Sequence, residues 1–311
     1  MDTSLRGRDL LSLADLTPTE LLMILDAADA QKRAWSRGVR SKPLEGKSIA
    51  LIFQKPSMRT RVSFEIASVR LGMHPVVMSG PDGAFSRGET VYDTTKVLER
   101  YCDAIVIRTF AQSMVDEIAA VASVPVINAL TDDHHPCQGL ADLLTIREHL
   151  GRLAGVKIAY VGDGNNMANT YLLAGALAGM SVAIATPLGY HTDVAIIEQA
   201  SAIAEQTGGR LDVSHDPSTA VAGADVVITD TWASMGQEEE HGERLSVFQP
   251  FQVNGGLMQQ AAPGALFMHC LPAHRGEEVV DDVIDAPCSV VFDEAENRLH
   301  AQKALLSLLL G

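Results

Sequence analysis

The sequence predicts an α/β protein made of two doubly wound parallel-sheet domains joined by interdomain helices. Short apolar runs alternate with helical patterns along the chain, which is the rhythm of parallel strands covered by helices. A long helical stretch at residues 138–150 separates two such alternating halves. The 311 residues exceed the length of a typical single domain, and each half is long enough to bury its own core.

The first half contains four expected strands, at residues 48–53, 74–78, 104–107 and 124–127. Helices are expected at residues 18–30, 58–71, 90–101 and 114–122. The second of these helices has apolar residues at Val62, Ile66 and Val69, close to helical spacing, and Ser57 is a favourable N-cap for it. A polar or glycine-containing loop follows each strand, so we expect a ligand at the carboxyl ends of the strands.

The second half repeats this alternation, with strands expected at residues 156–161, 181–185, 211–214, 226–229, 265–269 and 290–292. Helices are expected to begin near Met167 and Asp193, and an apolar helix is expected to close the chain at residues 295–310. We therefore expect one domain to contain residues 1–140 together with the returning segment 295–311, and the other to contain residues 141–294.

Charge and cysteine content narrow the classes of function. The net charge of −15 disfavours a nucleic-acid or anionic-membrane partner. The four cysteines have no close-paired metal spacing and are too sparse for a disulfide scaffold, which fits a reducing compartment. There is no apolar leader, and no run approaches the roughly 18 apolar residues that a membrane span needs. A soluble cytoplasmic protein is expected.

A phosphate-binding site is predicted directly after the first strand, in the stretch Lys55-Pro56-Ser57-Met58-Arg59-Thr60-Arg61. The first N–H groups of a helix have no partner in the helix, and the helix dipole favours an anion there. Arg59 could complete such a site. The alternative is a capped surface helix whose arginines face water.

Two other strand ends of the first half offer groups of matching chemistry. Arg108 follows the third strand, and the stretch His134-His135-Pro136-Cys137-Gln138 follows the fourth. A loop histidine is more often solvated than catalytic, and an arginine at a strand end is often a surface ion pair. Three strand ends together, however, offer groups suited to a phosphate and a carbonyl oxygen.

In the second half, Gly162-Asp163-Gly164-Asn165-Asn166 follows a strand and opens a helix. It lacks the third glycine of a dinucleotide fingerprint and the acidic residue after the next strand, so a nicotinamide cofactor is disfavoured. The asparagines either hold a polar ligand or only cap the helix. Asp230 and Cys270 follow two later strands and could orient and deprotonate an amine, although a lone Cys270 could equally be a small buried hydrophobe. The histidines form no metal-binding pattern, and no metal or other cofactor is expected.

Taken in order, these motifs resemble the aspartate/ornithine carbamoyltransferase superfamily, and within it the ornithine-specific branch. The matching stretches are Ser57-Met58-Arg59-Thr60-Arg61, His135-Pro136-Cys137-Gln138, Asp230 through Gly236, His269-Cys270-Leu271-Pro272 and Glu294-Ala295-Glu296-Asn297-Arg298. Each motif alone is weak evidence, whereas the ordered set is highly specific.

The resemblance implies a role for each matching position. For carbamoyl phosphate, the implied phosphate-binding groups are Ser57, the Met58 backbone, Arg59 and Thr60, and the carbamoyl-binding groups are Arg108, His135 and Gln138. The implied ornithine-binding residues are Asn166, Asp230, Ser234 and Met235. Cys270 and the Leu271 backbone would line the reacting centre alongside Arg298, which makes Cys270, Asp230, Arg108 and His135 the candidate catalytic residues.

One position departs from the family pattern. The glutamine that ornithine-specific members usually extend into a neighbouring subunit falls on Ala84, which cannot donate that hydrogen bond. Arg87 in the same loop is the candidate replacement, or else it is a surface arginine. The family assembles at least as trimers, so a homotrimer or a multiple of trimers is implied.

The implied reaction transfers the carbamoyl group of carbamoyl phosphate to the side-chain amine of L-ornithine and gives L-citrulline and phosphate, as in arginine biosynthesis. Two alternatives stay open: a carbamoyltransferase for another amine such as putrescine, and a non-catalytic carbamoyl-phosphate-binding protein. The sequence does not distinguish biosynthetic from catabolic use.

Overall fold

The structure is a computed structural model, and it describes residues 5–79, 84–85, 88–233 and 241–311. Its internal contacts divide the chain into two compact units. Unit 1 comprises Met1–Leu144 and Glu296–Gly311, and unit 2 comprises Thr145–Ala295. The chain therefore crosses between the units twice, inside helix α5 (Pro136–Leu150) and inside helix α12 (Val291–Leu310).

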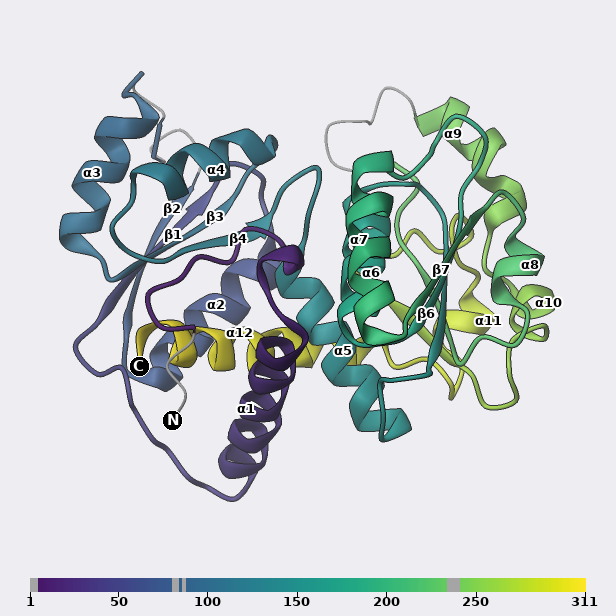
Figure 1. The fold of residues 1–311 in the computed structure, drawn as a ribbon, viewed down its shortest axis with the longest axis horizontal. Helices are drawn as coiled ribbons and strands as arrows, with labels where there is room; N and C mark the ends of the chain where they lie inside the picture. Colours follow the sequence, from purple (N-terminus) through teal and green to yellow (C-terminus); the bar gives the residue numbers. More distant parts are fainter. Residues whose placement is uncertain (1–4, 80–83, 86–87, 234–240) are drawn as a thin grey trace. The chain divides into compact units, whose positions relative to one another are not determined.

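Unit 1 is built on a four-stranded parallel sheet with the strand order β2-β1-β3-β4. Its strands are β1 (Ser48–Phe53), β2 (His74–Ser79), β3 (Ala104–Arg108) and β4 (Val126–Leu130). The other helices of this unit are α1 (Pro18–Ser36), α2 (Met58–Leu71), α3 (Val91–Tyr101), α4 (Gln112–Val121) and the short 3-10 turn Leu13–Asp15. Parallel crossovers are right-handed, so the change of direction at β1 places α2 on one face and α3 and α4 on the other (Figure 1).

Unit 2 contains a five-stranded parallel sheet with the order β7-β6-β5-β8-β9. Its strands are β5 (Lys157–Val161), β6 (Ser181–Ala185), β7 (Arg210–Ser214), β8 (Val226–Thr229) and β9 (Leu266–His269). Its helices are α6 (Asn166–Leu177), α7 (Val194–Thr207), α8 (Pro217–Val221), α9 (His241–Phe248), α10 (Gly255–Met258), α11 (Asp281–Ile284) and the 3-10 turn Gln249–Phe251. Helices α6 and α7 cover one face of this sheet, and α8, α10 and α11 lie on the other (Figure 1). The predicted fold class is confirmed, because both units are parallel sheets with helices on both faces.

Local sequence explains where the key helices begin and end. Helix α1 starts with a capping box, in which Thr17 and Glu20 satisfy each other's backbone N–H groups, and Pro18 occupies its first position. Helix α2 ends at Gly72, whose φ of 89° is left-handed. A Cβ atom at Gly72 would also lie 3.0 Å from the Glu45 Cα, so both backbone shape and space favour glycine there.

The prediction of a strand at residues 290–292 is wrong, because helix α12 already begins at Val291. Asp293 and Glu294 lie in its first turn, where acidic side chains suit the positive end of the helix dipole. Val291 is buried and Phe292 is 73% exposed. Only an isolated bridge between Ser289 and Phe267 extends the sheet at this point. The fourth strand also differs, since it runs over Val126–Leu130 rather than residues 124–127.

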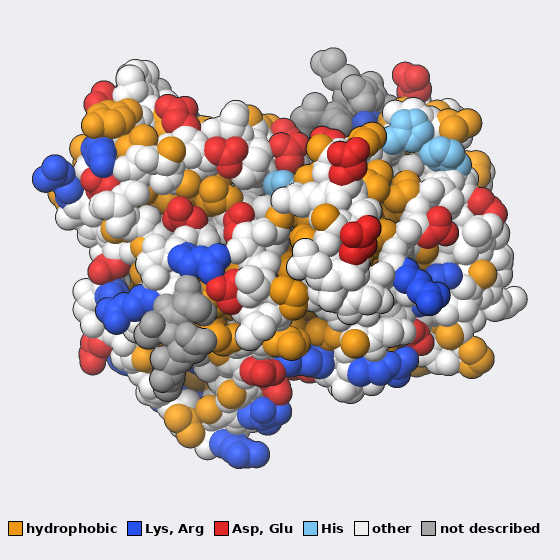
Figure 2. Space-filling view, in the orientation of Figure 1, with side chains coloured by type: hydrophobic (Ala, Val, Ile, Leu, Met, Phe, Trp, Pro, Cys, Tyr) orange, Lys and Arg blue, Asp and Glu red, His pale blue; other side chains and the backbone are white. Residues whose placement is uncertain are grey.

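On the face drawn in Figure 2, the Lys and Arg side chains of the described residues are interspersed with Asp and Glu instead of forming one broad basic area. This mixed pattern is unlike the basic stripe of a nucleic-acid-binding surface. Among the described residues, no helix has both the length and the apolar character that a membrane crossing requires.

Candidate active site

In both units, some of the residues selected from the sequence follow the two strands at which the chain reverses direction across the sheet, while His135 follows β4 and Cys270 follows β9. In unit 1 these paired strands are β1 and β3, which lead to Ser57 and end at Arg108 respectively. In unit 2 they are β5 and β8, which lead to Asn165 and Asp230. Ligands of open α/β sheets bind outside the carboxyl ends of the strands at this topological switch point.

The start of α2 has the geometry of an anion site. Ser57 is its N-cap in an extended conformation, and its Oγ accepts a hydrogen bond from the Thr60 N–H at 3.2 Å. The Met58 side chain is 71% exposed, and Met58 is the first residue of α2. The cap on α2 therefore agrees with the prediction from sequence.

Arg298 links the start of α2 to α5. Its Nη1 donates to the Gln138 Oε1 at 2.7 Å, and its Nη2 donates to the Thr60 Oγ1 at 3.1 Å. The Gln138 Nε2 in turn donates to the Asp142 Oδ1 at 2.7 Å. All four side chains are buried. The oxygen and the nitrogen of the Gln138 amide thus bond to different partners, which fixes the orientation of the amide.

His135 is buried among three arginines. Burial lowers the pKa of its imidazole well below 6.5, and the charges of Arg298, Arg108 and Arg59 lower it further. The ring is therefore neutral at physiological pH, with one nitrogen that donates and one that accepts. The charges of all three guanidinium groups therefore act on this ring. Unit 1 thus brings together the residues predicted at three strand ends.

Lys55 is a member of this region to which the sequence pattern assigned no role. Its side chain is buried, it forms an ion pair with Asp132, and its Nζ lies 4.4 Å from the centroid of the Phe110 ring. The Asp132 N–H donates to the Phe110 carbonyl at 2.8 Å. Lys55 therefore ties together the loops that follow β1, β3 and β4. Its place at a strand end was visible in the sequence, but its partners were not.

Cys137 lies within the His-Pro-Cys-Gln stretch but is not available for chemistry. Its side chain is fully buried, and burial raises the pKa of the thiol to about 12. The Sγ donates to the Asn128 carbonyl at 3.5 Å. Cys137 is therefore a neutral core residue.

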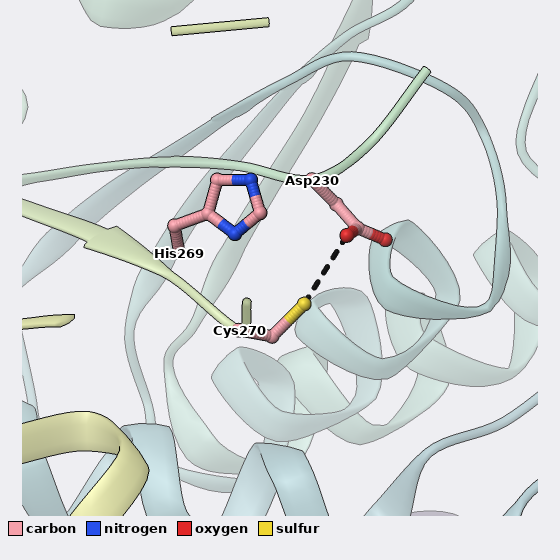
Figure 3. Close-up of side chains that lie close together, drawn as sticks. All are labelled: Asp230, His269 and Cys270. Atoms are coloured by element: carbon pink, nitrogen blue, oxygen red, sulfur yellow. Dashed lines mark hydrogen bonds between the residues drawn. The ribbon is translucent and has the colours of Figure 1, made fainter. Parts of the chain in front are cut away.

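In unit 2, Asp230 accepts hydrogen bonds on both carboxylate oxygens. The Cys270 Sγ donates to Oδ1 at 3.2 Å (Figure 3), and the Asn165 Nδ2 donates to Oδ2 at 3.0 Å. The Asn165 Oδ1 also caps α6 by accepting from the Met167 N–H at 2.9 Å. Asn166, the predicted ligand residue, is the first residue of α6 and is largely buried. Asn165 thus has two roles, of which the sequence suggested only the cap.

His269 supports the segment that carries Cys270. Its Nδ1 accepts from the Leu271 N–H at 2.9 Å, which leaves Nε2 as the protonated nitrogen that faces the Glu278 Oε1 at 3.1 Å. The His269 N–H also donates to the Glu294 Oε2 at 2.9 Å. His269, Glu278 and Glu294 are fully buried. Glu294 stands in one of the matching stretches, but the sequence assigned a role to neither glutamate.

Ligand atoms of Asp230, His269 and Cys270 lie within 4.8 Å of one another, a spacing that a metal ion can bridge (Figure 3). Both ring nitrogens of His269 are, however, already engaged by Leu271 and Glu278. This cluster therefore works as a hydrogen-bonded support and lacks an available imidazole ligand.

Three predicted residues, Arg87, Ser234 and Met235, lie outside the described residues. Ala84 is described, and together with Phe85 it packs against the hydrophobic core of unit 1. The replacement of the missing glutamine by Arg87 stays a prediction.

Comparisons with known proteins match this chain to two family models, to relatives and to solved structures. Residues 8–148 match the "Aspartate/ornithine carbamoyltransferase, carbamoyl-P binding domain" family, and residues 154–309 match the "Aspartate/ornithine carbamoyltransferase, Asp/Orn binding domain" family. The chain is 55% identical to the ornithine carbamoyltransferase of Pyrococcus abyssi, over all of this chain and 98% of the relative. It is 54% identical to that of Carboxydothermus hydrogenoformans, over the full length of both. The solved ornithine carbamoyltransferase of Pyrococcus furiosus has a TM-score of 0.97 and 54% identity, covering 99% of this chain and 98% of that one.

Proposed function

The chain belongs to the aspartate/ornithine carbamoyltransferase family, and we infer that it transfers the carbamoyl group of carbamoyl phosphate to the side-chain amine of L-ornithine. The products are L-citrulline and phosphate. The likeness to ornithine-specific relatives spans the whole chain, so it includes both substrate-binding halves.

One observation carries this reading from the residues: the neutral His135 lies near the guanidinium groups of Arg59, Arg108 and Arg298. A protein of net charge −15 gathers three cations at this one place. Carbamoyl phosphate carries a dianionic phosphate on a polarised carbonyl group. The three cations match the charge of the phosphate, and the neutral imidazole can donate to the carbonyl oxygen.

We assign the groups of unit 1 to carbamoyl phosphate. Ser57, the Met58 backbone, Arg59 and Thr60 hold the phosphate at the start of α2, while Arg108, His135 and Gln138 hold the carbamoyl group. Arg298 contacts the substrate and also fixes Gln138 and Thr60 by the bonds described above.

We assign the groups of unit 2 to ornithine. Asn166, Asp230, Ser234 and Met235 bind it, and Cys270 and the Leu271 backbone line the reacting centre. Asp230 is oriented by Asn165 and Cys270. Its carboxylate matches the cationic amine of ornithine.

In the proposed mechanism, the amine must lose a proton before it can attack, because its pKa is near the value of about 10.4 for lysine. Asp230, held by the hydrogen bond from the Cys270 thiol, accepts its proton, and the two side chains orient the amine. The amine nitrogen then attacks the carbonyl carbon. Donors from Thr60, Arg108 and His135 stabilise the resulting oxyanion. The C–O bond to phosphate then breaks as Arg59 and the helix N-terminus hold the leaving charge, and the departing phosphate takes the second proton of the amine nitrogen.

The two domains follow from these assignments. We propose that residues 1–140 and 295–311 form the carbamoyl-phosphate-binding domain, and that residues 141–294 form the ornithine-binding domain. The second family match runs to residue 309 and so includes most of α12. The hydrogen bonds of Arg298 to Thr60 and Gln138 support placing the end of α12 with the first domain.

We propose that the protein assembles as a homotrimer or a multiple of trimers. One face of α2 supports self-association, because Met58, Val62, Ile66 and Val69 are 71%, 51%, 39% and 55% exposed at helical spacing. A Val62→Glu variant that sedimented like the parent protein would count against this interface.

We also propose a cytoplasmic location and a role in arginine biosynthesis. All four cysteines are free, which suits a reducing compartment. The relative from Pyrococcus furiosus is named an anabolic enzyme, and it is 53% identical.

The experiment that tests the proposed function is a steady-state assay for citrulline with carbamoyl phosphate and ornithine. We expect turnover by the parent protein and its loss in Arg59→Ala, with carbamoyl-phosphate binding lost in calorimetry. Binding of carbamoyl phosphate without citrulline formation would instead identify a non-catalytic binding protein.

A further inference from the structure

A cluster of cationic side chains surrounds Trp35 at the end of α1, on the part of unit 1 where α1, α2 and α12 meet. The guanidinium carbon of Arg40 lies 3.7 Å from the centroid of the indole ring, and that of Arg70 lies 4.0 Å from it. The Lys303 Nζ lies 5.5 Å from the same centroid. We call these four residues the Trp35 cluster.

The Trp35 cluster is firmly positioned. Hydrogen bonds join α1 to α12 on either side of it, from the Gln31 Nε2 to the Ser307 Oγ at 2.7 Å and from the Lys32 Nζ to the Asn297 Oδ1 at 2.8 Å. The Arg40 Nη1 donates to the Trp35 carbonyl at 2.6 Å. Arg40 is thus held by a backbone carbonyl as well as by its contact with the indole ring.

Positive charge in the cluster exceeds the negative charge around it. Within the described part of the chain, no carboxylate forms an ion pair with Arg40, Arg70 or Lys303. The charge of Glu296 acts on Arg70 and raises its pKa, but the Glu296 carboxylate also contacts His300 at 3.0 Å.

Neighbouring positive charges lower the pKa values of two of these groups. Burial and then the charge of Arg40 lower the pKa of Arg70, and burial followed by Arg70 and Arg40 lowers that of Lys303. An anion bound between these groups would relieve this repulsion. Such crowding of cations is unusual in a chain with 24 basic and 39 acidic residues.

We propose that the Trp35 cluster is a second anion site of this protein, and that it binds a di- or triphosphate group. No role in carbamoyl transfer is assigned to Arg40, Arg70 or Lys303, so this site does not depend on the proposed function.

The chemistry of the cluster favours a phosphate chain over other anions. The planar fork of a guanidinium matches two phosphate oxygens, and two such forks flank one ring here. Three cations call for more negative charge than one carboxylate supplies, and a diphosphate carries more than an orthophosphate. Arg40 is exposed and Trp35 and Arg70 are half-buried, so a ligand can reach them from solvent.

The indole itself provides the test, because the chain has only two tryptophans. In a Trp232→Phe background, Trp35 is the only tryptophan, and its emission is followed as inorganic pyrophosphate is added at constant ionic strength. We expect a saturable change in emission. The half-saturating concentration should rise at least tenfold in Arg70→Gln and in Arg40→Gln.

Arg33→Gln is the matched control. Arg33 lies on α1, as Trp35 does, but it pairs with Asp29 at 2.6 Å. It should respond like the parent. Arg40→Gln changes an exposed residue, so it remains informative if Arg70→Gln fails to fold. The absence of a saturable response would overturn the proposal. An unchanged response in Arg40→Gln would do the same, because it would place the pyrophosphate elsewhere, for example at the Ser57 helix start. Citrate binding as tightly as pyrophosphate would overturn the assignment to phosphate.

Discussion

The Arg298 guanidinium donates a 2.7 Å hydrogen bond to the Gln138 side chain, although 160 positions separate the two residues in sequence. Both side chains are buried, and Arg298 also reaches Thr60 at the start of α2. Helix α12 thus contributes one member of a buried hydrogen-bonded cluster whose other members, Thr60 and Gln138, come from the first half of the chain.

Replacement of Arg298 by glutamine should therefore impair both stability and carbamoyl-phosphate use. Loss of a buried charged donor costs about 2 kcal/mol. Loss of one stabilising group at the reacting centre lowers kcat by about 10²–10³. Thermal melting and initial rates at varied carbamoyl phosphate would measure the two effects, with Arg33→Gln as a control. Parent-like kinetics in a folded Arg298→Gln protein would remove Arg298 from the site.

Cys270→Ala should lower kcat by at least tenfold and weaken ornithine binding, because Asp230 loses the thiol that donates to it at 3.2 Å. Cys270→Ser should recover part of the activity, since a hydroxyl can donate the same bond. Cys288→Ala is the matched control, as Cys288 is also a half-buried free cysteine of unit 2. Steady-state rates at varied ornithine concentration measure both effects. Normal turnover in Cys270→Ala would refute the assignment of Cys270 to the reacting centre.

Substitutions of Asn165 should separate its two roles. Asn165→Asp keeps an oxygen that caps α6, so stability should stay near that of the parent, but it replaces the donor to Asp230 by a second negative charge. We expect kcat/KM for ornithine to fall with little change in the melting temperature. Asn165→Ala should also lose about 1 kcal/mol of stability. If Asn165→Asp retained full activity, the contact with Asp230 would have no catalytic importance.

The buried His135 should make the folded protein sensitive to mild acid. The unfolded chain binds a proton at this residue near pH 6.5, whereas the pKa in the folded chain is well below that value. Stability is therefore fully present above pH 6.5 and falls below it, by about 1.4 kcal/mol per pH unit until the folded-state pKa is reached. Melting temperatures at pH 7.5 and 5.5 should differ less in His135→Gln than in the parent. An equal difference would contradict the neutral state of His135.

The sequence predicted most of the sheet elements because their patterns are local. Strands β1, β6 and β8 and helix α2 have the predicted bounds, since apolar runs, the Ser57 cap and Gly72 act over a few residues. The start of α12 was misjudged, because Val290, Val291 and Phe292 look like a short strand and only the acidic first turn marks a helix.

Residues of the candidate site could be predicted where a sequence motif contains them. They could not be predicted where only a contact in the folded structure identifies them. Ser57, His135 and Asp230 stand at strand ends that the sequence reveals. Lys55, Glu278 and Glu294 act through contacts with residues outside their own motifs, and no pattern of residues near them indicates those contacts.

The measurement that tests the central claim most directly is kcat/KM for ornithine and for putrescine, determined side by side with saturating carbamoyl phosphate. Putrescine has the same amine but lacks the α-amino-acid end, so its use reports what unit 2 recognises. We predict citrulline formation from ornithine with a kcat/KM at least a hundredfold above that for putrescine. A preference for putrescine, or no carbamoylated product from either amine, would contradict the assignment.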